Sequence, residues 1–146
     1  MPSFVADRPW HLVPVGVIAL LWHAGGSLDY ALTKLNVPTY VSQVPPEWLV
    51  YFDAMPVWVT AAWAVGVWGG LLGAILLLMR EHWAPLALAA SFFAVLAATL
   101  WLTIVSDPPL QEAVGREFTW VMILATLAGL LLWLYARRMR RLNVIT

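Results

Sequence analysis

The chain has 146 residues, no formal net charge and no cysteine. Hydrophobic residues make up 62% of it and charged residues 11%, whereas a soluble domain is about half apolar and about a quarter charged. This composition excludes intrinsic disorder, and the lack of a basic excess argues against nucleic acid as a partner. Without cysteine there is no disulfide, thiolate metal site or cysteine nucleophile. These exclusions leave a membrane protein.

Four apolar runs with few or no charges are long enough to cross the hydrocarbon layer, which takes about 20 residues. In chain order they predict transmembrane helices at about 11–33, 56–80, 83–106 and 118–137, within a single domain over 1–146. Between the first two, Pro45, Pro46 and Glu47 open a short aromatic segment that ends at Pro56. We expect an interfacial helix there, on the outer surface. The predicted fold class is an all-α membrane protein with four transmembrane helices and this short outer helix.

Basic residues predict the orientation of the helices. The segment before the first run carries Asp7 as well as Arg8 and no Ala-x-Ala cleavage site follows, so we expect a retained helix rather than a secretory signal. With four crossings, both termini and the middle loop share one side, and that side holds six arginines: Arg8, Arg80, Arg137, Arg138, Arg140 and Arg141. Cytoplasmic loops collect Lys and Arg, so both termini are predicted to be cytoplasmic. For Arg137, Arg138, Arg140 and Arg141 we favour a topology anchor that contacts anionic lipid headgroups over a regulatory site.

Small residues predict how the helices pack, because they let backbones approach closely in lipid. The second helix carries them on one side, at Ala62, Gly66, Gly69, Gly70 and Gly73. The third offers Ala90, Ala94 and Ala98 at four-residue intervals, and the fourth Ala125 and Gly129. We expect these faces to meet within the chain. Use of one of them for homodimerisation is the alternative.

The polar residues inside the membrane region gather in the first helix. At about 1.5 Å per residue, His23 is expected near the midplane and Asp29 in the outer third. His23, Ser27 and Tyr30 share one stripe of the helix, and Trp22, Gly26 and Asp29 form the adjoining one. An ionisable side chain at such depth should face the bundle or a wet cavity.

This stretch is a candidate wall of a small site open to the outer face, with Trp63 and Trp68 as aromatic walls. The candidate ligand-binding residues are Trp22, His23, Ser27, Asp29, Tyr30, Trp63 and Trp68. In the alternative, His23 is a neutral imidazole hydrogen-bonded across helices. Asp29 then reaches the outer headgroups or pairs with Lys34 or Arg116.

Other chemistries lack the residues they need. A bis-histidine haem requires two imidazoles at membrane depth, but His11 and His82 lie at the inner edge. A metal site would need ligands beyond His23 and Asp29, and no pair of carboxylates lies in the core for acid–base catalysis. We therefore expect no cofactor, no metal, no catalytic residue and no enzymatic activity.

Several short segments resemble a group of small, largely uncharacterised four-helix inner-membrane proteins of Gram-negative bacteria. They cover most of the chain and comprise Pro9-Trp10-His11-Leu12, Leu21-Trp22-His23-Ala24-Gly25-Gly26, Asp29-Tyr30, Pro56-Val57-Trp58, Ala62-Trp63-Ala64-Val65-Gly66-Val67-Trp68-Gly69 and Trp133-Leu134-Tyr135-Ala136-Arg137-Arg138. The resemblance implies a bacterial inner membrane, and some members carry a provisional sugar-transporter label. Members often have Asn where this chain has His23, which implies a hydrogen-bonding role for that position.

The expected function is a non-enzymatic accessory or scaffold subunit of a membrane assembly. Four short helices with small loops leave little room for an autonomous transporter. The alternative is a homo-oligomeric carrier or binding protein for a small solute or lipid that uses the face from Trp22 to Asp29. Expected partners are membrane lipids and other membrane proteins or a second copy, and no nucleic acid.

Overall fold

The computed structural model describes residues 7–146, so the first six residues of the predicted domain lie outside the description. The described residues form helices and no strand. Their order is α1 (Leu12–Lys34), α2 (Pro38–Val41), α3 (Pro46–Asp53), α4 (Val57–Met79), α5 (Ala84–Leu100), the π-helical η1 (Trp101–Val105), α6 (Leu110–Ala113) and α7 (Arg116–Arg141).

Four spans in the described chain are long and apolar enough to cross a membrane: α1, α4, α5 together with η1, and α7. The predicted fold class, an all-α membrane protein with four transmembrane helices, is therefore confirmed. The last helix extends beyond the predicted 118–137 at both ends. Its first turn carries Glu117 and its last turn Arg138, Arg140 and Arg141, and these charges suit the positive and negative ends of the helix dipole.

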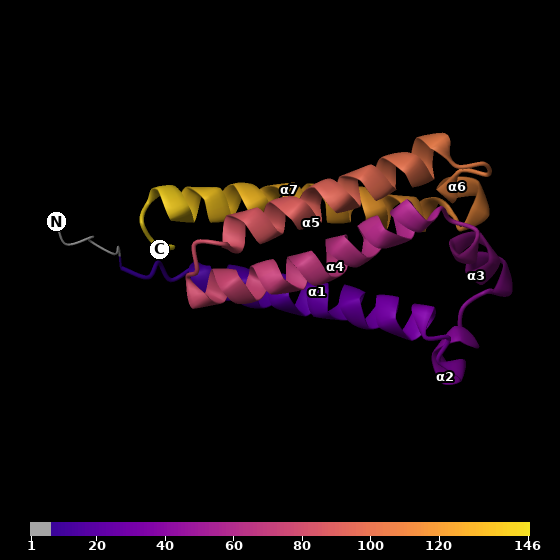
Figure 1. Cartoon of the computed structure of the whole chain (residues 1–146), viewed down its shortest axis with the longest axis horizontal. Coiled ribbons are helices and arrows are strands. Elements are labelled where there is room, and N and C mark those ends of the chain that lie inside the picture. The colour runs from indigo at the N-terminus through magenta and orange to yellow at the C-terminus, as the bar shows by residue number, and fades with distance from the viewer. Residues whose placement is uncertain (1–6) are drawn as a thin grey trace.

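The two ends of the bundle differ (Figure 1). At the end that we call the loop end, α2, α3 and α6 join the long helices. The other end, which we call the terminal end, carries the start of α1, the turn between α4 and α5, and the C-terminal residues. The short helix α3 matches the predicted interfacial helix. The four-residue helices α2 and α6 were not predicted.

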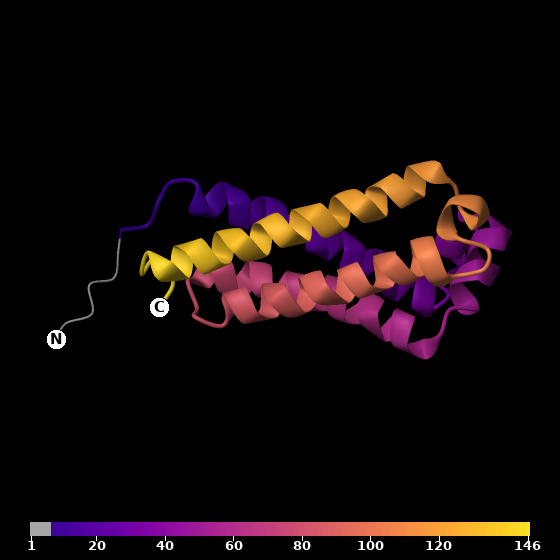
Figure 2. The same cartoon turned by 90° about the horizontal axis from the view of Figure 1, so that it is seen from above.

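The long helices form two layers, with α1 and α4 in one and α5 and α7 in the other (Figure 1). Viewed from above, α7 crosses over the layer beneath it (Figure 2). The extensive contacts follow the chain: α1 packs on α4, α4 on α5, and α5 on α7. The first and last spans, α1 and α7, are not an extensively packed pair.

The glycines of α4 are divided between two neighbouring helices. A Cβ on Gly66, Gly69 or Gly73 would meet atoms of α5, whereas a Cβ on Gly70 would collide with the His23 ring of α1. The neighbouring helices therefore approach α4 closely on two of its sides. The sequence predicted a single face of small residues, but the structure divides these residues between α5 and α1.

The alanines of α5 do not form the matching face as a set. Ala90 is exposed, Ala94 is half-buried and Ala98 is buried. Larger side chains of α5 enter the notches over the α4 glycines instead: Leu88, Ser91 and Val95. The predicted pairing of two small-residue faces is not seen because the glycines of α4 already leave space at the contact. Helix α5 fills that space with larger side chains.

Polar bonds join the layers where the helices touch. The Ser91 hydroxyl donates to the Gly66 carbonyl at 2.5 Å, and the hydroxyls of Thr99 and Thr126 lie 3.0 Å apart between α5 and α7. Such interhelical hydrogen bonds contribute about 0.6 kcal/mol each on average in membrane proteins.

The C-terminal residues fold back over the terminal end. Val144 and Ile145 are buried in the cluster that contains Leu12, Leu77 and Met139. The Arg80 side chain donates from Nε to the Val144 carbonyl at 2.7 Å, and the Thr146 amide donates to the Arg80 carbonyl at 3.1 Å. The tail therefore closes the apolar core at this end of the bundle.

Candidate functional site

The stripe of α1 that carries His23, Ser27 and Tyr30 faces α4. His23 is half-buried and its ring occupies the notch over Gly70, while Ser27 is only 2% exposed. The adjoining Gly26 lies against Val67, which belongs to the same face of α4. The structure thus brings this polar stripe into the α1–α4 contact.

Trp63 connects α1, α3 and α4 near the loop end. Its ring meets Tyr30 edge-on, with ring centroids 4.9 Å apart, and lies 6.1 Å from the ring of Phe52 in α3. The Lys34 ammonium stands 5.9 Å from the centroid of the Trp63 ring. This geometry is that of a packed aromatic junction with a cation beside it.

Asp29 has a partner from outside the helix. The hydroxyl of Tyr40, in the short helix α2, donates a hydrogen bond to Asp29 Oδ1. This hydrogen bond, with partial burial and the negative charge of Asp29, raises the pKa of Tyr40 from 10.0 to about 12. The carboxylate is therefore satisfied by a neutral donor at the end of the span.

Lys34 pairs with Asp53 and not with Asp29, the partner considered from the sequence. Its Nζ lies 3.8 Å from Oδ1 of Asp53, which is largely exposed. An exposed pair of this kind contributes little to stability, at about 0–1 kcal/mol. The pair does, however, tie the end of α1 to the end of α3.

The Ser27 hydroxyl is the one buried side-chain polar group without a hydrogen-bond partner among residues 7–146. A serine nucleophile needs a base within hydrogen-bond reach, and His23, one turn away in the same helix, does not provide that bond. The arrangement places a hydroxyl and an imidazole on one buried face without coupling them.

Trp22 and Trp68 do not join this cluster. Their exposed fractions are 53% and 48%, and both belong to the outer surface of the bundle. Within one copy of the chain they do not lie with Trp63, so their place in the wall of a site stays a prediction. Lipid is as apolar as a protein core, so a tryptophan in a spanning helix faces either with little difference in free energy.

A pocket of about 550 Å³ lies at the loop end, and no residue of the polar stripe of α1 lines it. Its lining includes the carboxylates of Glu47 and Asp107 and the rings of Tyr51 and Trp101. The hydroxyls of Tyr51 and Ser106 lie 3.0 Å apart and join α3 to the end of η1. Sequence reasoning missed this pocket because residues from three separate segments form it.

The C-terminal arginines occupy different environments. The Arg137 guanidinium lies over the ring of Trp133, at 5.1 Å from the centroid, while Arg138 lines a pocket at the terminal end. All four of the arginines, Arg137, Arg138, Arg140 and Arg141, are exposed. Within residues 7–146, no three His, Cys, Asp or Glu side chains are grouped so that they could hold a metal ion.

Three contacts described here involve aromatic residues that the sequence did not single out as candidates. Tyr40 and Phe52 stand in α2 and α3, and Tyr135 stands in α7, where its hydroxyl lies 2.6 Å from His11 Nδ1. The only available signal was proximity in the chain, since Tyr40 follows Asp29 by eleven positions.

Comparison with protein-family models, with curated proteins and with solved structures gave no match to this chain.

Proposed function

We propose that the chain is a non-enzymatic accessory or scaffold subunit of a membrane assembly, and that the outward face of α1 packs against a helix of another subunit. The supporting observation concerns Gly25. Every other glycine of the chain has a neighbouring atom within 4 Å of the place where a Cβ would stand, whereas Gly25 has none.

No helix of the chain packs closely against Gly25, although Gly is about 1 kcal/mol less favourable than Ala in a helix interior. A contact outside the chain would explain the glycine at this position. Leu21, Trp22 and Leu28 lie within about 60° of Gly25 around the helix, and all three are exposed. Asp29, one turn further on, belongs to the same face but is half-buried and accepts a hydrogen bond from Tyr40. Gly25 is thus a notch between apolar ridges. Such a surface fits the backbone of a second helix, as small residues do at membrane helix interfaces.

The proposed location is the cytoplasmic membrane of a bacterium, with both termini in the cytoplasm. Six of the eight cationic side chains belong to the terminal end, and cytoplasmic segments are enriched in such residues. The resemblance to small bacterial inner-membrane proteins supports the same location.

The experiment is native mass spectrometry of the tagged full-length protein, gently extracted from bacterial membranes, with Gly25→Leu compared with the unaltered chain. A Cβ at this position meets no atom within 4 Å and the surrounding surface is exposed, so we expect Leu to fill the notch with abundance unchanged. Overpacking costs about 1–3 kcal/mol, so occupancy of the assembly should fall about tenfold.

Ala128→Leu is the matched control, because Ala128 is an exposed small residue of another spanning helix, α7. Loss of the same co-assembling chain in Gly25→Leu, with retention in Ala128→Leu, supports the proposal. Equal occupancy in all three proteins contradicts it, as does a bare monomer for the unaltered chain.

The loop-end pocket favours a second function, a homo-oligomeric carrier or binding protein for a small solute. Two carboxylates and two aromatic rings line about 550 Å³, which is within the usual range of ligand pockets, about 300–1,000 Å³. The same measurement separates the functions. A homo-oligomer with a reproducible small adduct supports the carrier, whereas a discrete complex with another polypeptide supports the accessory subunit.

A further inference from the structure

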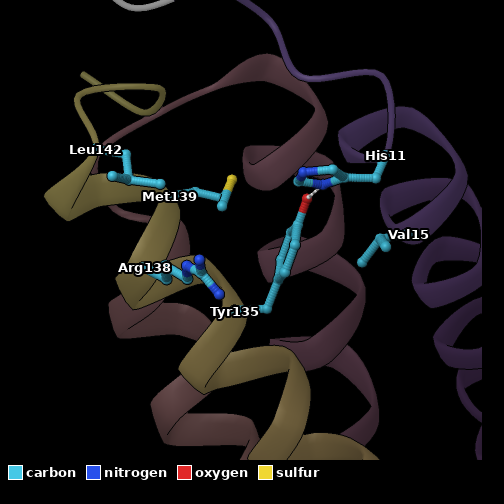
Figure 3. A pocket seen from close by; sticks show the side chains of 6 residues that line it. All are labelled: His11, Val15, Tyr135, Arg138, Met139 and Leu142. Carbon is cyan, nitrogen blue, oxygen red and sulfur yellow. Dashed lines mark hydrogen bonds between the residues drawn. The ribbon is translucent and has the colours of Figure 1, made fainter.

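A second pocket, which we call the terminal pocket, opens between α1 and α7 at the terminal end (Figure 3). Its volume is about 350 Å³, and its lining residues are His11, Val15, Tyr135, Arg138, Met139 and Leu142. Figure 3 shows Tyr135 reaching from α7 towards His11, with Val15 on the α1 side and Arg138 on the α7 side.

A single polar contact spans this pocket. His11 Nδ1 and the Tyr135 hydroxyl lie 2.6 Å apart, and the two rings meet edge-on with centroids 5.6 Å apart. At this end Leu12 of α1 and Met139 of α7 share one buried cluster, but α1 and α7 are not an extensively packed pair along the rest of their length. The His11–Tyr135 contact is therefore a polar link between two helices that pack little on each other.

The lining has the chemistry of a site for an amphipathic anion. Arg138 supplies a guanidinium, the side chain whose planar donors match phosphate oxygens best. The imidazole and phenol of His11 and Tyr135 add hydrogen-bonding groups next to it. The remaining wall is apolar, and Val15 stands one turn further into the membrane than His11.

The position of the pocket distinguishes a lipid from a dissolved anion. It lies where α1 begins and α7 approaches its end, which is the level of the headgroups for helices that span the membrane. The terminal end carries six of the eight cationic side chains of the chain but only two of the eight acidic ones, Asp7 and Glu81. This asymmetry attracts anionic lipid to that surface.

We propose that the terminal pocket binds one anionic phospholipid, with the phosphate at Arg138 beside the His11–Tyr135 pair and the acyl chains along the seam between α1 and α7. The basic residues of α7 then do more than attract the membrane surface. One of them holds a particular lipid between the first and last spans, and the lipid completes a helix contact that the chain itself leaves incomplete.

The test is native mass spectrometry of the full-length protein in detergent, titrated with palmitoyl-oleoyl-phosphatidylglycerol. We expect one tightly bound molecule. Arg138→Gln should weaken its binding about tenfold, which is the loss expected for one charge-assisted hydrogen bond. Palmitoyl-oleoyl-phosphatidylcholine should not compete at equal concentration.

The matched control is Arg140→Gln, which removes the same charge from the opposite side of α7, because two residues are about 200° apart around a helix. Little change in Arg140→Gln supports the site. Equal weakening in the two variants means that the lipid responds to net charge alone, and it overturns the proposal.

Two further measurements address the source of the phosphate and the role of the pocket wall. Glycerol 3-phosphate should fail to displace the lipid, and displacement at comparable concentration would make the ligand a dissolved anion instead. Tyr135→Phe keeps the ring but removes the hydroxyl, so lipid binding should weaken while the charge stays the same. If lipid binding is unchanged in both Arg138→Gln and Tyr135→Phe while helix content is preserved, the proposal that the terminal pocket binds the lipid is overturned.

Discussion

Asp29 shows how a single ionisable residue is tolerated near the end of a membrane-spanning helix. A charged group at the bilayer centre costs about 2.5–3.5 kcal/mol on insertion scales, and the cost falls when the group reaches a donor or the interface. Tyr40 supplies that donor from α2, immediately after the span. The carboxylate is therefore satisfied locally, without an ion pair inside the membrane.

The Tyr40–Asp29 bond predicts a particular dependence on alkaline pH. The folded pKa of Tyr40, about 12, lies above the ordinary value of 10.0, so its stabilising contribution is complete below pH 10 and is lost as the pH rises towards 12. The ultraviolet difference spectrum between the unaltered protein and Tyr40→Phe, in lipid nanodiscs, should show this late ionisation. Asp29→Asn should move the midpoint towards 10, and a midpoint already near 10 in the unaltered protein would contradict the assignment.

At the scale of elements, α4 is the helix on which the fold depends most. It packs on α5 through Gly66, Gly69 and Gly73, and on α1 through Gly70. Each contact places a side chain of the neighbouring helix where the glycine leaves room. The close fit between α1 and α4 also uses glycines of α1, because Gly16 lies against Leu78 and Gly26 against Val67.

Gly70→Ala should destabilise the protein by about 1–3 kcal/mol, because the added methyl group collides with the His23 ring. His23→Ala in the same chain removes the obstacle, so the double variant should recover part of the lost stability. Unfolding by dodecyl sulfate in mixed micelles measures these differences. Gly25→Ala, at a position with open space, serves as the control, and it should not destabilise the protein because Ala is the better helix former. A double variant no more stable than Gly70→Ala alone would refute the contact.

The sequence could predict the spans but not which way their faces point. Run length alone located the four long helices, and Pro45–Pro46 located α3. No comparable signal separates Trp63, which is half-buried against neighbouring rings, from Trp68, which is exposed, because lipid and protein interior are similarly apolar. Tyr40 was missed for another reason, since its contact with Asp29 depends on the path of the chain after α1 and not on helical periodicity.

At the scale of the whole molecule, charge is divided between the two ends. The terminal end is rich in arginine, and the loop end carries six of the eight acidic residues. Membrane insertion responds to the positive residues in short flanking segments, so this division supports the proposal that the terminal end stays in the cytoplasm.

Single-cysteine labelling should report the orientation directly, because the chain has no cysteine of its own. Gln43 is exposed at the loop end, and His82 is exposed in the turn between α4 and α5. A membrane-impermeant maleimide should label Gln43→Cys in bacterial spheroplasts, and His82→Cys only after permeabilisation. The reverse pattern would show that the termini face outwards.

The pairing of α1 with α4 has a consequence for the order in which the protein is made. The ribosome delivers α1 well before α4, so during synthesis the His23 ring and the Ser27 hydroxyl enter the bilayer before their packing partner exists. Asp29 is different, because its hydrogen-bond donor Tyr40 lies only eleven positions later, in the short helix α2 that follows α1. Asp29, the most costly group of α1 to place in lipid, thus gains its hydrogen-bond donor from residues that directly follow α1. His23 and Ser27 gain their packing partner only when α4 has been made.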